Sequence, residues 1–172
     1  MEYQIRLAGL EDLERLSDLW AAMVEEARRQ VPDLAILPDS RGYFLQFAGV
    51  GIASQNAGIY LAKRGSELLG FVLGQIVTPE PPFLPEPYGY VAALYVIPDW
   101  RRKGIGGALM RSLTQWLAGR AIRRMELHTY VQNEEAFDFW RSVGFVVLGL
   151  RLGAKVIPPL NPRLCRQTKR PE

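Results

Sequence analysis

The sequence predicts an α/β fold in which helices cover both faces of one mixed β-sheet. Two observations carry this prediction. Strand-like and helix-like segments alternate in the second half of the chain, whereas the tight turn at residues 64–66 joins two strands in the first half. Strands separated by a helix form parallel right-handed crossovers, while a short turn makes an antiparallel hairpin. The length of 172 residues predicts one domain over residues 1–157, followed by a tail over 158–172.

The first half of the chain combines alternating and helical apolar patterns. Alternation at Tyr3, Ile5 and Leu7 is typical of a strand. Two helices are expected after it, and the helical pattern of the second is weakened by Gly49 and Gly51. The expected elements are a strand over 3–7, helices over 10–27 and 40–53, and strands over 58–63 and 68–77.

The second half opens with residues 79–87, where five prolines remove the N–H groups that a strand ladder needs. A stiff surface loop is expected there. Asn133 caps a later short helix, and Gly144 ends it. The expected elements are a strand over 88–97, a helix over 105–117, a strand over 125–131, that short helix, and a last strand over 145–152.

Composition excludes several functional classes. The chain is 48% hydrophobic and 23% charged, which is typical of a soluble globular protein. One cysteine and one histidine supply neither an internal disulfide nor a closed Cys/His zinc site, so no metal is expected. The longest apolar stretch, around residues 47–53, is too short to span a bilayer, and no secretory signal is visible. We therefore expect a cytoplasmic protein without a membrane partner.

The net charge of +3 is concentrated at the C-terminus. Residues 155–172 hold five basic side chains and one acidic one, whereas residues 1–154 hold sixteen basic and seventeen acidic side chains. A nucleic-acid surface needs Lys and Arg clustered on the fold itself, so a nucleic-acid partner is not expected.

The most informative segment is residues 94–107, where an apolar strand stops at Pro98 and a basic, glycine-rich turn opens a helix. Glycines allow a ligand to approach the backbone closely, and the first N–H groups of a helix have no internal acceptors. With the helix dipole and the cations of Arg101, Arg102 and Lys103, this arrangement predicts a site for a phosphate or pyrophosphate. The segment matches neither a Walker A loop nor a dinucleotide fingerprint.

The spacing R-x-x-G-x-G from Arg101 to Gly106 resembles motif A of the GCN5-related N-acetyltransferase (GNAT) superfamily. A second signature of that family, N-x-x-A followed by G-F, resembles Asn133, Ala136 and Gly144-Phe145. The resemblance covers about residues 3–152 and implies acetyl-CoA as cosubstrate. The cofactor-binding residues that it implies are Leu94, Tyr95, Val96, Arg101, Arg102, Lys103, Gly104, Ile105, Gly106, Gly107, Asn133 and Trp140.

The resemblance also implies the reaction: transfer of an acetyl group from acetyl-CoA to a primary amine of a small molecule or protein, by direct attack in a ternary complex. His128 is the candidate base, because histidine ordinarily titrates near neutrality. The Val96 N–H is the candidate donor to the developing oxyanion. The alternative for His128 is a strand histidine without a chemical role.

Trp140 stands where many relatives have a tyrosine that protonates the leaving thiolate, and an indole N–H is not a useful acid. Tyr130, Tyr95 or water could replace it. The same departure keeps a second function open, a catalytically weak acyl-CoA-binding sensor or interaction module.

Three residues are candidates for the acceptor site. Tyr90 would shape it, and Glu80 and Glu86 beside the proline-rich loop could attract a cationic amine, although both also fit ordinary solvated loop acids. The last strands and the tail could pair with a second copy of the chain, so a homodimer is one possible assembly.

Overall fold

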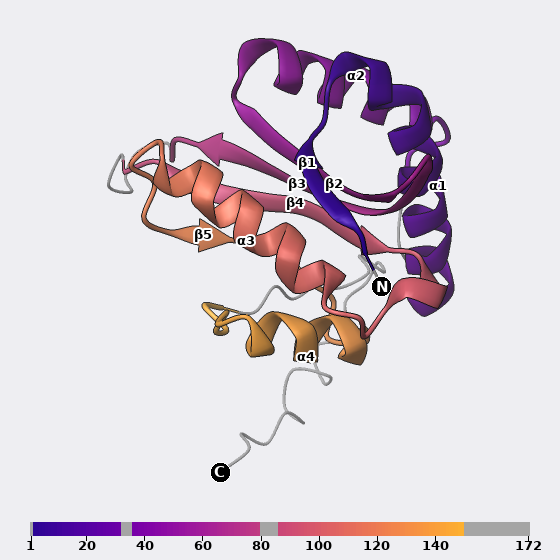
Figure 1. The fold of residues 1–172 in the computed structure, drawn as a ribbon. Helices are drawn as coiled ribbons and strands as arrows, with labels where there is room; N and C mark the ends of the chain where they lie inside the picture. Colours follow the sequence, from indigo (N-terminus) through magenta and orange to yellow (C-terminus); the bar gives the residue numbers. More distant parts are fainter. Residues whose placement is uncertain (1, 32–35, 80–85, 150–172) are drawn as a thin grey trace, which may run out of the picture.

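The computed structural model describes residues 2–31, 36–79 and 86–149. Its centre is a five-stranded sheet in the order β1-β2-β3-β4-β5 (Figure 1). The first four strands are antiparallel neighbours, and β5 is parallel to β4, which confirms the mixed sheet. The strands are β1 (Gln4–Leu7), β2 (Ala57–Arg64), β3 (Glu67–Val77), β4 (Tyr88–Val96) and β5 (Met125–Glu126).

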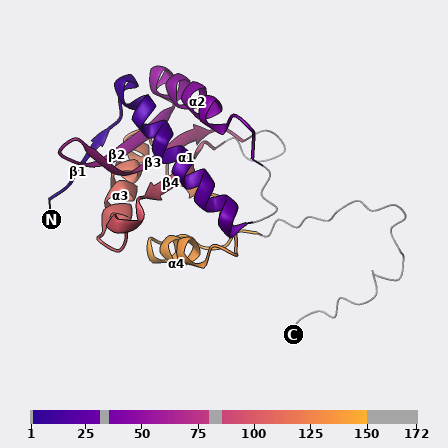
Figure 2. The same ribbon diagram turned by 90° about the vertical axis from the view of Figure 1, so that its right-hand side faces the viewer.

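Helices cover both faces of the sheet, as the sequence predicts. Two of them lie together on one face, a third crosses the other face, and the fourth lies near the C-terminal end of the first (Figure 2). In that order they are α1 (Leu13–Gln30), α2 (Ser40–Ser54), α3 (Ile105–Ala118) and α4 (Glu134–Ser142). Short 3₁₀ turns precede α1, at Leu10–Asp12, and α3, at Pro98–Trp100.

The core consists of two layers that follow the two-residue period of the strands. Phe71 and Leu73 pack with Leu16 and Phe44 on the α1/α2 face. Their neighbours on the opposite face, such as Val72, pack with α3. The central strands are therefore apolar on both sides.

Two predicted strands are wrong in extent. The segment predicted as a strand over 125–131 pairs with β4 only through Met125 and Glu126, because β4 then diverges and leaves residues 127–131 without a ladder partner on that side. Of the strand predicted over 145–152, residues 145–149 form none. The N–H of Phe145 instead donates to the Trp140 carbonyl and closes the end of α4.

Residues 150–152 and 80–85, and with them Glu80 and most of the proline-rich loop, lie outside the described residues. So does the tail, and the domain boundary at residue 157 stays a prediction. Across the described ranges, no helix is long and apolar enough to cross a membrane. Within the same ranges, no group of three or more His, Cys, Asp or Glu side chains is placed to hold a metal ion.

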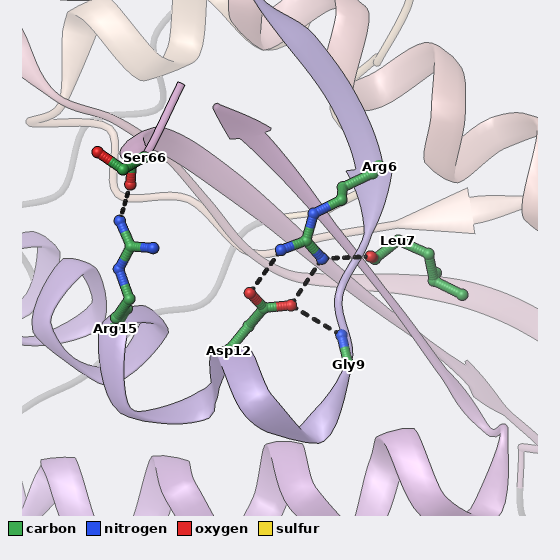
Figure 3. Close-up of polar contacts among 6 residues, drawn as sticks. All are labelled: Arg6, Leu7, Gly9, Asp12, Arg15 and Ser66. Atoms are coloured by element: carbon green, nitrogen blue, oxygen red, sulfur yellow. Dashed lines mark hydrogen bonds and ion pairs between the residues drawn. The ribbon is translucent and has the colours of Figure 1, made fainter. Parts of the chain in front are cut away.

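An ion pair between the half-buried Arg6 and the buried Asp12 joins β1 to the start of α1 (Figure 3). Asp12 is 4% exposed, and its two carboxylate oxygens accept hydrogen bonds from Arg6 at 2.6 and 2.7 Å. The Gly9 N–H donates to the same carboxylate at 2.9 Å. The hydrogen bond from Arg6 holds the pKa of Asp12 below its ordinary value. Nearby, Arg15 donates to the Ser66 carbonyl and ties α1 to the β2–β3 turn.

We expect Asp12→Asn to lower the free energy of unfolding at pH 7 by about 1.5–3 kcal/mol, because it removes a charged acceptor from Arg6 and Gly9. A carboxylate with a lowered folded pKa contributes stability above its unfolded pKa of about 3.9 and loses it as the pH falls through the folded value. The difference between wild type and variant should therefore shrink below about pH 4. Urea unfolding from pH 7 to pH 2 measures it.

Glu14→Gln is the matched control, because Glu14 lies two residues further along the chain and its ion pair with Arg41 is exposed. It should change the unfolding free energy little at any pH. A deficit in Asp12→Asn that stays constant down to pH 2 would contradict the role assigned to the ion pair.

Candidate functional site

The outer edge of β4 carries the first part of the site. The Ile97 N–H donates to the Leu69 carbonyl at 2.9 Å, which fixes the hydrogen-bonded pairs of the β3–β4 ladder. Leu94 and Val96 therefore occupy non-hydrogen-bonded positions, where N–H and C=O groups point away from the partner strand. These backbone groups point to the side of β4 where β5 is no longer paired with it. An extended ligand could therefore form hydrogen bonds with them as a neighbouring strand would.

A β-bulge accompanies the divergence of β4 and β5. Leu73 pairs with Ala93 and Gly74 pairs with Val91, so Ala92 is an extra residue on β4. Bulges bend a strand and increase its twist. The pairing between β4 and β5 ends at Tyr90, two residues before this bulge. The bend and the gap thus occur at the same point of the sheet.

The turn after β4 carries the second part of the site. Two of its residues have left-handed backbone conformations, Arg102 with φ 59° and Gly104 with φ 80°. This conformation costs a non-glycine residue about 1–2 kcal/mol, so the turn holds Arg102 in a strained state. The N-terminus of α3 follows directly, with its free N–H groups and the positive end of its dipole. The geometry is that of an anion site.

Gly106, in the first turn of α3, allows α4 to approach closely. A Cβ at this position would lie 3.0 Å from the Phe139 ring. The absence of a side chain there lets Phe139 and its neighbour Trp140 lie beside the helix start. Trp140 also packs edge-to-face against Phe139 and Phe145.

A cavity of about 580 Å³ extends from the start of α3 along β4, between α1 and α4. This volume lies in the range of small-molecule sites. Of the twelve residues predicted to bind a cofactor, eleven line it, namely Leu94, Tyr95, Val96, Arg101, Arg102, Gly104, Ile105, Gly106, Gly107, Asn133 and Trp140. The exception is Lys103, whose ammonium group donates to the Asp99 carbonyl and lies 4.7 Å from the centre of the Trp100 ring.

Arg101 lines the cavity, but its guanidinium group is bound by the protein. It donates to Glu26 at 2.7 Å and to the Val96 carbonyl at 3.0 Å, and it lies 3.5 Å from Glu135. It also lies 5.7 Å from the centre of the Tyr95 ring. The hydrogen bond to Glu26 raises the pKa of Arg101, so the group stays charged. Arg101 thus connects β4 to α1 and α4.

Glu26 is a residue that sequence reasoning missed. It lies 75 positions before Arg101 on an amphipathic helix that carries other acids, and no local pattern distinguishes it from them. Asn133 has a structural role besides lining the cavity. Its side-chain oxygen accepts the Ala136 N–H and caps α4, as the sequence predicts.

The catalytic candidates Val96 and His128 lie in different places, and His128 contacts the acceptor-site candidate Tyr90. Val96 lines the cavity, whereas Tyr90 and His128 meet further back along the sheet, where the Tyr90 hydroxyl and His128 Nδ1 are 3.0 Å apart. Burial raises the pKa of Tyr90, so its hydroxyl stays protonated. Tyr130 is about half exposed and outside the cavity lining, and Glu86 is exposed at the start of β4.

We expect Gly104→Ala to lower the free energy of unfolding by about 1–2 kcal/mol, because alanine is strained at φ 80°. Gly107→Ala is the matched control. Its Cβ would meet only Arg111 at 3.6 Å, an ordinary contact, and alanine inside a helix gains about 0.5–1 kcal/mol over glycine. Thermal unfolding should therefore show effects of opposite sign, and equal effects would contradict the geometry of this turn.

Solved structures share this fold. A predicted acetyltransferase from Clostridium acetobutylicum, solved with acetyl-CoA, matches with a TM-score of 0.74 and 15% identity over 90% of this chain and 96% of that one. The acetyltransferase AAC(6')-Iy, solved with the bisubstrate analogue CoA-S-monomethyl-acetylneamine, matches with a TM-score of 0.71 and 16% identity over 91% and 99%. At these identities the likeness concerns the fold.

Sequence comparison points the same way. An uncharacterised N-acetyltransferase of Methanocaldococcus jannaschii is 36% identical over 52 residues, which are 30% of this chain and 23% of that protein. The match therefore spans less than a quarter of the relative. The model of the acetyltransferase (GNAT) family matches residues 17–145, which include β4, the turn, α3 and α4. This chain belongs to the acetyltransferase (GNAT) family.

Proposed function

We propose that the protein transfers an acetyl group from acetyl-CoA to a primary amine of a small molecule. The observation that carries this proposal is the cavity that joins an anion site at the start of α3 to the outward N–H and C=O groups of β4. Acetyl-CoA has matching parts, a pyrophosphate followed by an extended arm with amide groups. In the reaction a bond forms between the amine nitrogen and the acetyl carbon, the C–S bond breaks, and the departing thiolate takes up a proton.

The residues fit the cosubstrate part by part. The Arg102 guanidinium and the first N–H groups of α3 would hold the pyrophosphate, since the Arg101 guanidinium is bound to Glu26. Leu94 and Val96 would pair with the amide groups of the arm. Trp140 would pack against the thiol end, as the family resemblance implies.

Two backbone N–H groups are available to the developing oxyanion, those of Val96 and Leu94. Residues along a strand rise about 3.3 Å each, so the Leu94 N–H lies about 7 Å closer to Tyr90 than that of Val96. If His128, bonded to Tyr90, removes the proton from the amine, the Leu94 N–H is the better placed donor. Val96 would then hold the arm nearer the phosphates.

The amine needs a base, because an alkylamine with a pKa of about 10.4 is mostly protonated at pH 7 and then has no lone pair for attack. To accept a proton at Nε2, His128 must carry its own on Nδ1 and donate it to the Tyr90 oxygen. The Tyr90 hydroxyl can accept this proton, so the contact is compatible with the reactive tautomer. The cytoplasmic location, the homodimer and the roles of Tyr130, Glu80 and Glu86 stay predictions.

We expect Arg102→Ala to weaken CoA binding about tenfold, the loss of roughly one charge-assisted hydrogen bond. Lys103→Ala should change it less than about twofold, because the Lys103 ammonium group is turned toward Asp99 and Trp100. Titration calorimetry measures both, and Arg102→Lys, which keeps the charge, should recover part of the loss. Equal losses in the two alanine variants would contradict the assignment, and absence of CoA binding by wild type would remove the proposed function.

We expect His128→Ala to lower kcat about 100-fold at pH 7 with unchanged CoA affinity, in line with the loss of a general base. The variant should also lack the fall in rate toward low pH that protonation of a general base produces, which is the acid limb of the pH–rate profile. Tyr90→Phe should shift that limb while the variant still turns over. Release of free thiol with an amine panel measures these rates. An unchanged pH profile in His128→Ala would exclude His128 as base, and tight CoA binding without transfer to any amine would favour the acyl-CoA-binding module.

A further inference from the structure

A second cavity, of about 460 Å³, lies between α2 and the neighbouring ends of β2 and β3. It shares no lining residue with the cavity beside α3. We call it the α2 cavity. Its polar wall consists of Gln46, Ser54, Asn56 and Gln75, and Tyr43 and Phe47 supply an aromatic edge.

The α2 cavity is linked to the Tyr90–His128 pair by the register of the sheet. Ala57, Gln75, Tyr90 and Glu126 are paired in one row across β2, β3, β4 and β5. Residues paired across neighbouring strands share a face, and Ala57 faces α2, where its Cβ would meet one built on Gly51. Gln75 in the cavity wall is therefore the direct neighbour of Tyr90, about 5 Å away at the backbone.

The lining of the α2 cavity selects a type of ligand. Among the described residues, every side chain that lines it is uncharged. It therefore offers no counter-charge to an acidic ligand or to one with several amines. Three side-chain amides and two hydroxyl groups offer both donors and acceptors. Tyr43 is 55% exposed and stacks on Phe47, which leaves an aromatic surface for the C–H face of a ring.

The central strand beneath the cavity, β3, offers no free edge to an extended peptide. Peptides that bind to sheets usually add to a free strand edge. β3 is paired on both sides at Gln75, with Ala57 and with Tyr90, so its backbone groups are already used. Over β3, recognition therefore comes from side-chain amides and hydroxyl groups, which suit a polyhydroxylated ring.

We propose that the α2 cavity holds the neutral, hydroxyl-rich body of the amine acceptor, so that the acceptor is a monoamine of the amino-sugar class. This inference rests on the proposed function. With its ring against Tyr43 and its hydroxyls on Gln75 and Asn56, such a molecule extends its aminomethyl end over Tyr90 toward His128. Glu126, at the end of the same row, places one carboxylate on that side, 3.4 Å from the Arg124 guanidinium.

Two acceptors that share an aminomethyl-substituted six-membered ring test the inference, methyl 6-amino-6-deoxy-α-glucoside and cyclohexylmethylamine. Each carries one aminomethyl group on a six-membered ring, and only the first has hydroxyls. The sugar should have a kcat/KM at least about tenfold higher, the value of roughly one or two net hydrogen bonds. Equal values, or a preference for cyclohexylmethylamine, would overturn the inference.

Variants of the lining residues test whether the preference for the sugar acceptor arises in the α2 cavity. Gln75→Leu should raise KM for the sugar about tenfold and leave kcat, CoA affinity and the KM of cyclohexylmethylamine nearly unchanged. Tyr43→Ala, at an exposed position, should act in the same direction and serves if Gln75→Leu unfolds. Gln115→Leu makes the same chemical change on the exposed side of α3 and should have no effect. A rise in KM for both acceptors alike, or for neither, would contradict the assignment.

A binding measurement separates this inference from the proposed function. Saturation-transfer NMR with methyl α-glucoside, which has no amine and cannot be acetylated, should show contact with wild type and lose it in Gln75→Leu and Tyr43→Ala. That result would stand even if no amine were acetylated. Absence of transfer from the protein to this sugar would refute the cavity assignment, even if other amines are acetylated.

Discussion

The candidate site depends on one constraint, that the polar backbone groups along the outer edge of β4 need partners. Buried N–H and C=O groups are costly without a hydrogen bond. β4 is paired with β3 along its length but with β5 at only two residues. Leu94 and Val96 therefore face a cavity in place of a strand. Arg101 satisfies one of these groups, the Val96 carbonyl, and the others are left to solvent or to a ligand.

Arg101 shows how a conspicuous cation is used by the fold. Its bonds to Glu26 and to the Val96 carbonyl fix the end of β4 against α1, and its approach to Glu135 brings α4 into the same junction. The anion site thus combines a positioned arginine, an exposed arginine at a strained turn and a helix N-terminus. Removal of Arg101 would disturb the walls of the cavity as well as its charge.

Local patterns in the sequence were sufficient for most of the fold. The strand over 88–97, the glycine-rich turn and the helix over 105–117 are confirmed within one residue at each end, because their apolar periods and stop signals are strong. The extent of β5 could not be predicted, since it depends on the divergence of β4, and the bulge at Ala92 has no local signal. The Arg101–Glu26 hydrogen bond could not be predicted either, because it joins residues 75 positions apart. The same holds for the α2 cavity, because the apolar residues of α2 are not gathered on one face of the helix.

The two cavities lie in different parts of the fold and have no residue in common. One is built from α1, β4, the turn, α3 and α4, and the other from α2 and the ends of two strands. Mutational drift in the exposed positions of α2 can therefore reshape one wall of the protein while the glycine turn and its strained arginine stay intact. With this division, the shape of the α2 wall can change without moving the backbone groups that line the other cavity.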